Sequence, residues 1–299
     1  MFYGREKELQ KLSRRYAGEK SECVVVYGRR RVGKTALTKE FCRGKSVIYF
    51  SALNANSFDN LEELSRVISE YRLSTPEGTD CVIYPSYADA FRSVEHISSS
   101  KRIIFVIDNY QYLLKAEESV AARIWNMVKR PRDENKLFHI LCGSPQCFME
   151  NRVLGYESSL HGLITVKIKL EPLTYRESAL MTPGLPTERL AQIYGITGGI
   201  PHYINKLDVR GKVDTALMRN VFDTSSYLFE EPENLLKQDL REPAMYNSIL
   251  TAMAHGAARL GEISSGVGIE SGKCAKYLQV LLDLGIVEKE TPITEKPGR

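Results

Sequence analysis

From the first residues to about residue 170, short apolar segments of the chain alternate with amphipathic ones. The apolar segments are rich in β-branched residues, which is typical of strands buried on both faces of a sheet. The expected strands are Cys23–Tyr27, Val47–Ser51, Ile103–Ile107, Phe138–Cys142 and Val166–Leu170. The helical spacing between them predicts helices that include Lys34–Cys42, Leu61–Arg72 and Ser119–Lys129. This alternation predicts an α/β fold, a parallel sheet with helices on both faces.

The second half of the chain has a different pattern. From Thr174 to Leu236 the hydrophobic positions recur only at helical spacing, and Pro183-Gly184 and Gly198-Gly199 interrupt them. A last helical unit begins near Glu242, and its expected helices are Pro243–His255, Leu260–Ser265 and Ser271–Leu284. Their apolar residues at i, i+3 and i+4 predict a small core of their own.

Composition places the chain among ordinary globular proteins. Its 299 residues are 43% hydrophobic and 26% charged, which suits two or three compact units. No apolar run approaches the roughly 20 residues of a membrane span, and the charged start of the chain lacks the apolar centre of a signal peptide. We therefore expect a cytoplasmic protein without a membrane partner. The six cysteines include no C-x-x-C pair and are interpreted as reduced core residues.

Positive charge is concentrated near the start of the chain. The net charge is +4, yet residues 1–50 carry 13 Lys and Arg against 5 Asp and Glu, a local balance of +8. A polyphosphate ligand would explain this concentration, and a nucleic acid would also be attracted to it.

Residues Gly28–Thr35 read Gly-Arg-Arg-Arg-Val-Gly-Lys-Thr and match the phosphate-binding pattern G-x-x-x-x-G-K-[ST]. A strand runs into this segment and a helix leaves it, so backbone N–H groups and the helix N-terminus converge on one anion. Lys34 is expected to reach the β- and γ-phosphates, and Thr35 to hold Mg²⁺ through its hydroxyl oxygen. The other residues expected to bind nucleotide here are Gly28, Arg29, Arg30, Arg31, Val32 and Gly33 of this segment, and Ala36, which follows it.

A second half of the same chemistry follows at the end of another apolar strand. Asp108 ends the segment Ile103–Ile107 and is expected to hold Mg²⁺ opposite Thr35. The next residue, Asn109, occupies the place where a water-activating carboxylate is usual. An amide can orient water but cannot accept its proton.

Together these motifs resemble the archaeal and bacterial AAA+-like ATPases of the STAND type, in the P-loop NTPase class with an inserted strand (ASCE). The resemblance is carried by Tyr3-Gly4-Arg5, by the phosphate loop, by Leu141-Cys142-Gly143-Ser144 and by Gly198-Gly199-Ile200-Pro201. It implies that Arg5 and Pro201 lie near the adenine. It also implies that Ser144 faces the γ-phosphate and that Lys34, Asp108, Asn109 and Ser144 form the catalytic set.

The resemblance also implies a domain order. It divides the chain into a P-loop ATPase core over residues 1–172, a helical lid over 173–240 and a winged helix over 241–299, with Thr291–Glu295 as the first edge of the wing. Members of the family often continue into a nuclease-like domain, so the chain is expected to be a fragment or a shortened member. It departs from the family at Asn109, and at Leu163 and Ile164, where arginines are frequent.

On the third helix of the last unit, Lys273, Lys276 and Gln279 are expected to face outward, as in helices that enter the DNA major groove. The unit carries as many acidic as basic residues, so double-stranded DNA and a protein partner or self-association remain alternatives.

Two hypotheses for function follow. In the first, the chain is a slow, Mg²⁺-dependent ATPase that works as a nucleotide-controlled switch. ATP would close the helical lid on the core and reposition the winged helix, which would link the switch to DNA. In the second, it is a DNA-binding regulator or protein-interaction module that holds ATP without significant hydrolysis. A P-loop kinase is disfavoured because the expected helical lid and winged helix have no place in a small kinase.

Overall fold

The computed structural model describes residues 2–18, 20–74, 82–129, 136–209, 211–240 and 242–290. The chain divides into two compact units, Met1–His202 and Tyr203–Arg299. The first division point expected from the sequence, residue 172, lies inside the first unit. The boundaries at 172 and 240 therefore stay predictions.

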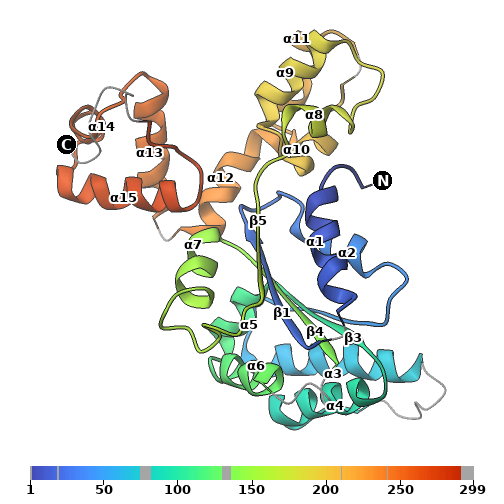
Figure 1. Cartoon of the computed structure of the whole chain (residues 1–299). Coiled ribbons are helices and arrows are strands. Elements are labelled where there is room, and N and C mark those ends of the chain that lie inside the picture. The colour runs from blue at the N-terminus through green and yellow to red at the C-terminus, as the bar shows by residue number, and fades with distance from the viewer. Residues whose placement is uncertain are drawn as a thin grey trace. The chain divides into compact units, whose positions relative to one another are not determined.

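A five-stranded parallel sheet forms the centre of the first unit (Figure 1). The strands are β1 Glu22–Gly28, β2 Val47–Ser51, β3 Ile103–Asp108, β4 Leu137–Gly143 and β5 Val166–Leu170, and their order is β2-β3-β4-β1-β5. All five expected strands are confirmed to within one residue at each end. In the sheet, β4 lies between β1 and β3. Strand β2, which comes between β1 and β3 in the sequence, lies at one edge of the sheet. An inserted strand of this kind confirms the expected P-loop NTPase fold class.

The helices of the first unit lie before, between and after these strands. They are α1 Glu6–Tyr16, α2 Lys34–Cys42, α3 Ser57–Leu73, α4 Tyr87–Ser100, α5 Tyr110–Ala116, α6 Ser119–Lys129, α7 Gln146–Phe148, the π-helical turn η1 Met149–Val153, α8 Tyr175–Ala179 and α9 Thr187–Thr197. Helix α10, Pro201–Lys206, crosses from the first unit into the second.

Two apolar layers hold these helices against the sheet. On one face, side chains of α3, α4 and α6 such as Leu64, Phe91 and Ile124 pack with strand residues into one cluster. On the other face, Leu12 of α1 and Leu37 of α2 belong to a second cluster. Figure 1 shows the same division, with α1 and α2 on one side of the sheet and α3 and α4 on the other. Since β1, β3 and β4 are covered on both faces, every residue in them is buried.

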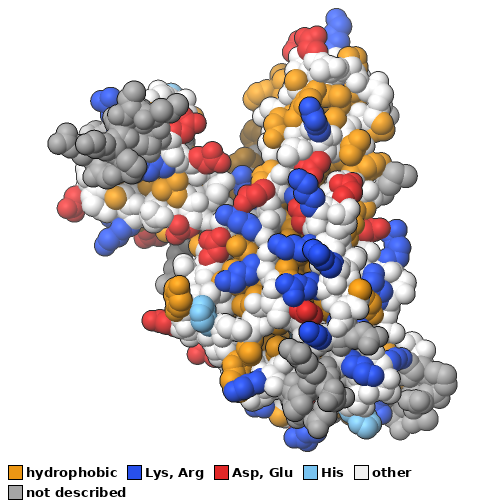
Figure 2. Space-filling view, viewed as in Figure 1, with side chains coloured by type: hydrophobic (Ala, Val, Ile, Leu, Met, Phe, Trp, Pro, Cys, Tyr) orange, Lys and Arg blue, Asp and Glu red, His pale blue; other side chains and the backbone are white. Residues whose placement is uncertain are grey.

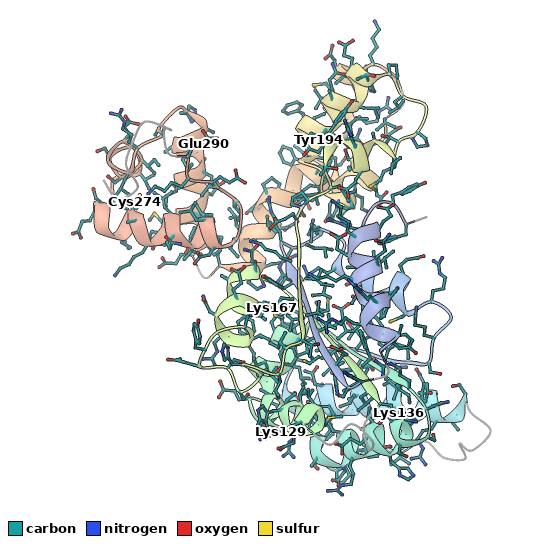
Figure 3. All side chains as sticks on the ribbon, viewed as in Figure 1. Lys129, Lys136, Lys167, Tyr194, Cys274 and Glu290 are labelled. Atoms are coloured by element: carbon teal, nitrogen blue, oxygen red, sulfur yellow. The ribbon has the colours of Figure 1, made fainter. Side chains whose placement is uncertain are left out.

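The second unit is helical over its described residues. Its elements are α11 Val213–Leu217, the π-helical turn η2 Met218–Phe222, α12 Tyr227–Asp239, α13 Pro243–Ala254, α14 Leu260–Val267 and α15 Ser271–Asp283. The last three match the expected helices and pack around Tyr246, Ile249, Ile263, Cys274 and Leu281; Figure 3 labels Cys274 on α15. The expected wing at Thr291–Glu295 lies outside the described residues, so the winged helix stays a prediction. Within the described part of the chain, no helix has the length and apolar character needed to cross a bilayer.

One buried polar side chain lies in the middle of the sheet. His139 of β4 is fully buried and meets Phe105 of β3 edge to face, with ring centroids 6.2 Å apart. Neither ring nitrogen has a hydrogen-bond partner among the described residues. Burial therefore disfavours the charged imidazolium and lowers the pKa of His139 from 6.5 to about 4.

This burial predicts a loss of stability in acid. Because the folded-state pKa is lowered, the unfolded chain binds the proton more readily, so the His139 contribution is complete above pH 6.5 and declines as the pH falls toward 4. The full difference corresponds to roughly 3 kcal/mol. We expect His139→Leu to remove this part of the acid sensitivity. The measurement is urea unfolding between pH 7 and pH 4.5, followed by the fluorescence of Trp125, which packs against the core of the first unit.

The matched control is His96→Leu, since His96 is an exposed residue of α4. An unfolding midpoint of the His139→Leu protein that falls with acid as steeply as that of the wild type would contradict the assignment.

Candidate functional site

The loop between β1 and α2 has the backbone geometry that its glycines predict. Gly28 has φ 145° and Gly33 has φ 98°, both in the region that favours glycine. A Cβ atom on Gly28 would lie 2.3 Å from the carbonyl oxygen of Leu170 in β5. The loop therefore leaves β1 in close contact with the neighbouring strand, a path that a side chain at residue 28 would block.

Lys34 lies at the first position of α2 and is buried against the loop. Its ammonium group donates to the carbonyl oxygens of Gly28 at 3.1 Å and of Arg29 at 2.8 Å. The loop carbonyls therefore hold the Lys34 ammonium group against the phosphate-binding segment. Thr35 and Ala36, the next two residues, are exposed.

Asp108 joins three elements at the carboxyl edge of the sheet. Its side chain is buried, and its Oδ2 accepts hydrogen bonds from the Thr35 hydroxyl at 2.7 Å and from the Tyr49 hydroxyl at 2.8 Å. Its Oδ1 accepts from the N–H of Asn109 at 2.9 Å. Burial, with the nearby Asp108 carboxylate as the next cause, raises the pKa of Tyr49. Tyr49 therefore stays a neutral donor to this carboxylate.

Thr35 and Asp108 offer a hydroxyl oxygen and a carboxylate oxygen within hydrogen-bonding distance of each other. Oxygen donors of this type are the ligands that Mg²⁺ prefers, and Mg²⁺ usually keeps several waters as well. The two residues predicted to hold the metal therefore fit it chemically.

Asn109 and Ser144 follow the ends of two adjacent strands. Asn109 has φ 55°, a left-handed conformation that Asn tolerates better than most residues, and its side-chain amide donates to the Ser51 hydroxyl at 3.3 Å. Ser144 is buried directly after β4. Its N–H donates to the side-chain oxygen of Gln111 at 3.1 Å.

The residues expected near the adenine lie beside the phosphate loop. The guanidinium of Arg5 donates to the carbonyl oxygens of Val32, at 3.4 Å, and of Glu171. A Cβ atom on Gly33 would lie 3.8 Å from Cγ of Pro201. The structure thus brings Arg5 and Pro201 to the loop from distant parts of the sequence.

The position of Pro201 depends on a close backbone contact. The N–H of Leu173 donates to the carbonyl oxygen of Gly199 at 2.8 Å. A Cβ atom on Gly199 would lie 2.1 Å from the carbonyl oxygen of Leu173. The second glycine of the Gly-Gly-Ile-Pro segment therefore lets α10 begin next to the sheet.

Basic residues continue beyond the loop. Arg30 donates to the Tyr112 hydroxyl at 3.3 Å, and Arg31 has φ 67°. Lys167 and Lys169 are exposed on the edge strand β5. On the face shown in Figure 2, Lys and Arg side chains gather over the middle of the first unit, where Figure 3 labels Lys167. Of these residues, Arg30 and Arg31 are among the 13 basic residues counted in residues 1–50, whereas Lys167 and Lys169 lie further along the chain.

Sequence reasoning missed three side chains that the structure adds to this group, Tyr49, Ser51 and Gln111. A signal for two of them was present, because Tyr49 and Ser51 lie in the last three residues of β2 and parallel strands end at a common edge. Gln111 had no such signal, since its role depends on how α5 turns back against β4.

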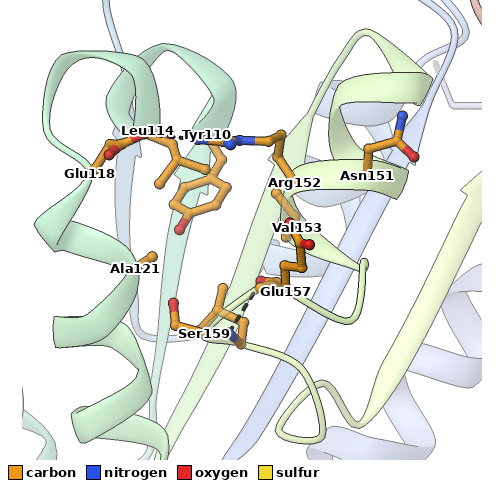
Figure 4. A pocket seen from close by; sticks show the side chains of 11 residues that line it. Tyr110, Leu114, Glu118, Ala121, Asn151, Arg152, Val153, Glu157 and Ser159 are labelled. Atoms are coloured by element: carbon orange, nitrogen blue, oxygen red, sulfur yellow. Dashed lines mark hydrogen bonds and ion pairs between the residues drawn. The ribbon is translucent and has the colours of Figure 1, made fainter.

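A separate cavity of about 280 Å³ lies between α5, α6, η1 and the segment that follows η1 (Figure 4). Glu118 and Arg152 form an ion pair of 2.8 Å at its edge, and Tyr110 and Leu160 are among the residues that line it. None of the residues predicted to bind nucleotide lines this cavity.

A glycine loop between β1 and α2, an acidic end of β3 and an inserted strand β4 together define a P-loop ATPase fold of the AAA+-like kind. The chain belongs to the family of ATPase domains found predominantly in Archaea, whose model matches residues 2–207. The expected resemblance to archaeal P-loop ATPases is confirmed at this level.

Two proteins of Methanocaldococcus jannaschii are similar in sequence. The uncharacterized protein MJECL04 is 31% identical over 304 residues, a match that covers 100% of this chain and 65% of the relative. The chain therefore spans less than two thirds of that protein's length. The uncharacterized ATP-binding protein MJ0423 is 45% identical over 47 residues, 16% of this chain and 80% of the relative.

Solved structures agree with the fold. The Walker-type ATPase PABY2304 of Pyrococcus abyssi superimposes with a TM-score of 0.74 at 19% identity, over 97% of this chain and 91% of that one. The ORC2 protein of Aeropyrum pernix, solved with ADPNP and ADP, superimposes with a TM-score of 0.61 at 16% identity, over 95% and 86%. At these identities the likeness supports the fold alone.

Proposed function

We propose that the chain binds ATP with Mg²⁺ at Gly28–Thr35 and works as a slow ATPase whose ATP and ADP states act as a switch. The observation that carries this proposal is the hydrogen bond from Thr35 to the buried Asp108, beside a loop that already holds the Lys34 charge. The names of the relatives support it, since MJ0423 is called an ATP-binding protein and PABY2304 a Walker-type ATPase.

Each residue has a role in this proposal. The backbone N–H groups of residues 28–36 and the start of α2 surround the phosphates, and Lys34 places its charge at the β- and γ-phosphates. Thr35 and Asp108 hold Mg²⁺, which neutralises phosphate charge when it is bound. Arg5 and Pro201 enclose the base, and Ser144 faces the γ-phosphate.

We expect hydrolysis to be slow because the chain lacks a carboxylate at Asn109 and positive charge at Leu163 and Ile164. Asn109 can orient a water molecule but cannot take its proton. Leu163 and Ile164 supply no positive charge to the transition state at the place where related ATPases are expected to have arginines. The alternative is a DNA-binding regulator or protein-interaction module that holds ATP without significant hydrolysis.

The binding site is tested by Lys34→Ala. The substitution removes the charge placed at the β- and γ-phosphates, and charge-assisted hydrogen bonds are worth about 1.5–3 kcal/mol. We therefore expect ATP affinity to fall roughly tenfold to a hundredfold in titration calorimetry, with an unchanged circular dichroism spectrum. Lys11→Ala, at an exposed position of α1, removes the same charge elsewhere and should leave the affinity unchanged. Equal affinities of both variants would refute the site.

The hydrolysis rate is tested by Asn109→Glu. A carboxylate at this position can accept the proton of the attacking water, and general-base help is typically worth 10²–10⁴-fold. We expect a smaller gain, about tenfold in single-turnover hydrolysis, because the charge missing at Leu163 and Ile164 is not restored. Asn109→Gln is the matched control. Its side chain is as long as that of glutamate and is placed on the same left-handed backbone, but its amide cannot accept a proton. A glutamate variant no faster than the glutamine variant, at equal ATP affinity, would place water activation elsewhere.

We further propose that the last unit links the nucleotide state to double-stranded DNA. Lys273, Lys276 and Gln279 are all exposed on α15 at a spacing of three residues, so they lie on one side of the helix. The Aeropyrum pernix ORC1 protein, solved in complex with DNA, has a related fold with a TM-score of 0.53 at 15% identity. A protein partner or self-association is the alternative use of the same surface.

The DNA proposal is tested by the double substitution Lys273→Glu and Lys276→Glu. Each lost phosphate contact lowers the salt slope of binding by about one, so the variant should bind duplex DNA more weakly and with a flatter salt dependence. Lys212→Glu with Lys237→Glu changes the same charge at exposed positions outside α15 and serves as the control. Absence of a gel shift by the wild-type chain at low salt would assign the surface to protein contacts instead.

A further inference from the structure

Gln111 links the ends of two strands at the nucleotide edge of the sheet. It lies on α5, which starts two residues after Asp108, and its side chain is completely buried. Its Oε1 accepts the hydrogen bond from the N–H of Ser144, the first residue after β4. One side chain thus ties the helix that follows β3 to the backbone that carries Ser144.

The surrounding backbone leaves room for this link. A Cβ atom on Gly143 would lie 2.9 Å from Oε1 of Gln111 and 2.5 Å from the sulfur of Met149. Glycine at the end of β4 therefore admits the Gln111 side chain. The lack of a side chain at Gly143 thus makes space for the side chain of Gln111, although 32 positions separate the two residues in the sequence.

The other end of the Gln111 amide is unsatisfied. Its Nε2 atom is buried and has no hydrogen-bond partner in the described part of the chain. A buried donor without an acceptor costs free energy, and an apolar side chain of similar shape would avoid that cost. The glutamine thus leaves one of its own polar atoms unpaired while it accepts the hydrogen bond of the Ser144 N–H, which an apolar side chain could not do.

We infer that Gln111 is a positioning residue, which fixes the backbone at Ser144 so that the serine side chain contacts the γ-phosphate. This inference rests on the proposed nucleotide site. ATP has the γ-phosphate and ADP lacks it, so the effect of Gln111 falls on the discrimination between the two. Gln111 thereby affects the preference for ATP over ADP and does not affect the contacts that both nucleotides share.

The experiment compares the affinities for ADP and for a non-hydrolysable ATP analogue by calorimetry. Gln111→Met keeps the shape and removes the acceptor, so we expect the preference for the ATP analogue to fall about tenfold while the affinity for ADP stays the same. Ser144→Ala should give the same result. The double variant should show no further loss, because both substitutions remove one shared contact.

A merely structural role predicts a different outcome, in which both affinities fall and the losses of the two single variants add. Gln238→Met, an exposed position of α12, controls for the change in residue type. Gln111→Asn, which is too short to reach Ser144, replaces Gln111→Met if that protein does not fold.

The two proposals fail in different ways. A wild-type chain that binds neither nucleotide overturns the nucleotide site itself. A wild-type chain that binds both, with Lys34→Ala weakening both, leaves the site intact; an unchanged preference in Gln111→Met then overturns the positioning role.

Discussion

The arrangement of the site depends on how the carboxylate of Asp108 is accommodated. A buried carboxylate is costly unless hydrogen bonds replace its lost water. Here the replacements come from α2, from β2 and from the backbone that begins α5. Satisfying one charge therefore draws three elements to one point of the sheet edge. The same contacts hold the Thr35 hydroxyl and the Asp108 carboxylate within hydrogen-bonding distance of each other.

Two backbone contacts set the path of the chain around that point. The loop leaves β1 against the carbonyl of Leu170, and the segment before α10 lies against the carbonyl of Leu173. Gly28 and Gly199 permit these approaches because each lacks a Cβ atom and each has a positive φ. Pro201 thereby lies next to Gly33, and Arg5 links the loop to the segment after β5 by donating to the carbonyl oxygens of Val32 and Glu171.

Much of this could be predicted from the sequence because its signals are local. The segments Cys23–Tyr27 and Ile103–Ile107 are continuous apolar runs, which are typical of strands in a sheet covered on both faces. Gly28, Gly33 and Lys34 belong to one short motif, Gly28–Thr35, whose spacing can be recognised from the sequence alone. Tyr49 and Gln111 were not predicted because their partners, Asp108 and Ser144, are distant in the sequence. Tyr49 contacts Asp108 through the register of β2 against β3, and Gln111 contacts Ser144 through the direction of α5. Arg5 and Pro201 were placed by resemblance, since no periodicity connects them to the loop.

At the turn from β3 into α5, three successive residues have different surroundings. Asn109 takes the left-handed conformation that turns the chain from β3 into the helix, and its side chain contacts Ser51 on the β2 side. Tyr110 lines the cavity of Figure 4, and Gln111 reaches toward Ser144 on the β4 side. Successive residues on a helix point about 100° apart, so one tight turn distributes its side chains to both neighbouring strands and to the helical layer. The sharpness of the turn after Asp108 thus determines which side chains lie at the carboxyl edge of the sheet. Asn adopts this left-handed conformation at a smaller conformational cost than most other residues, which gives a structural reason for an amide side chain at this turn.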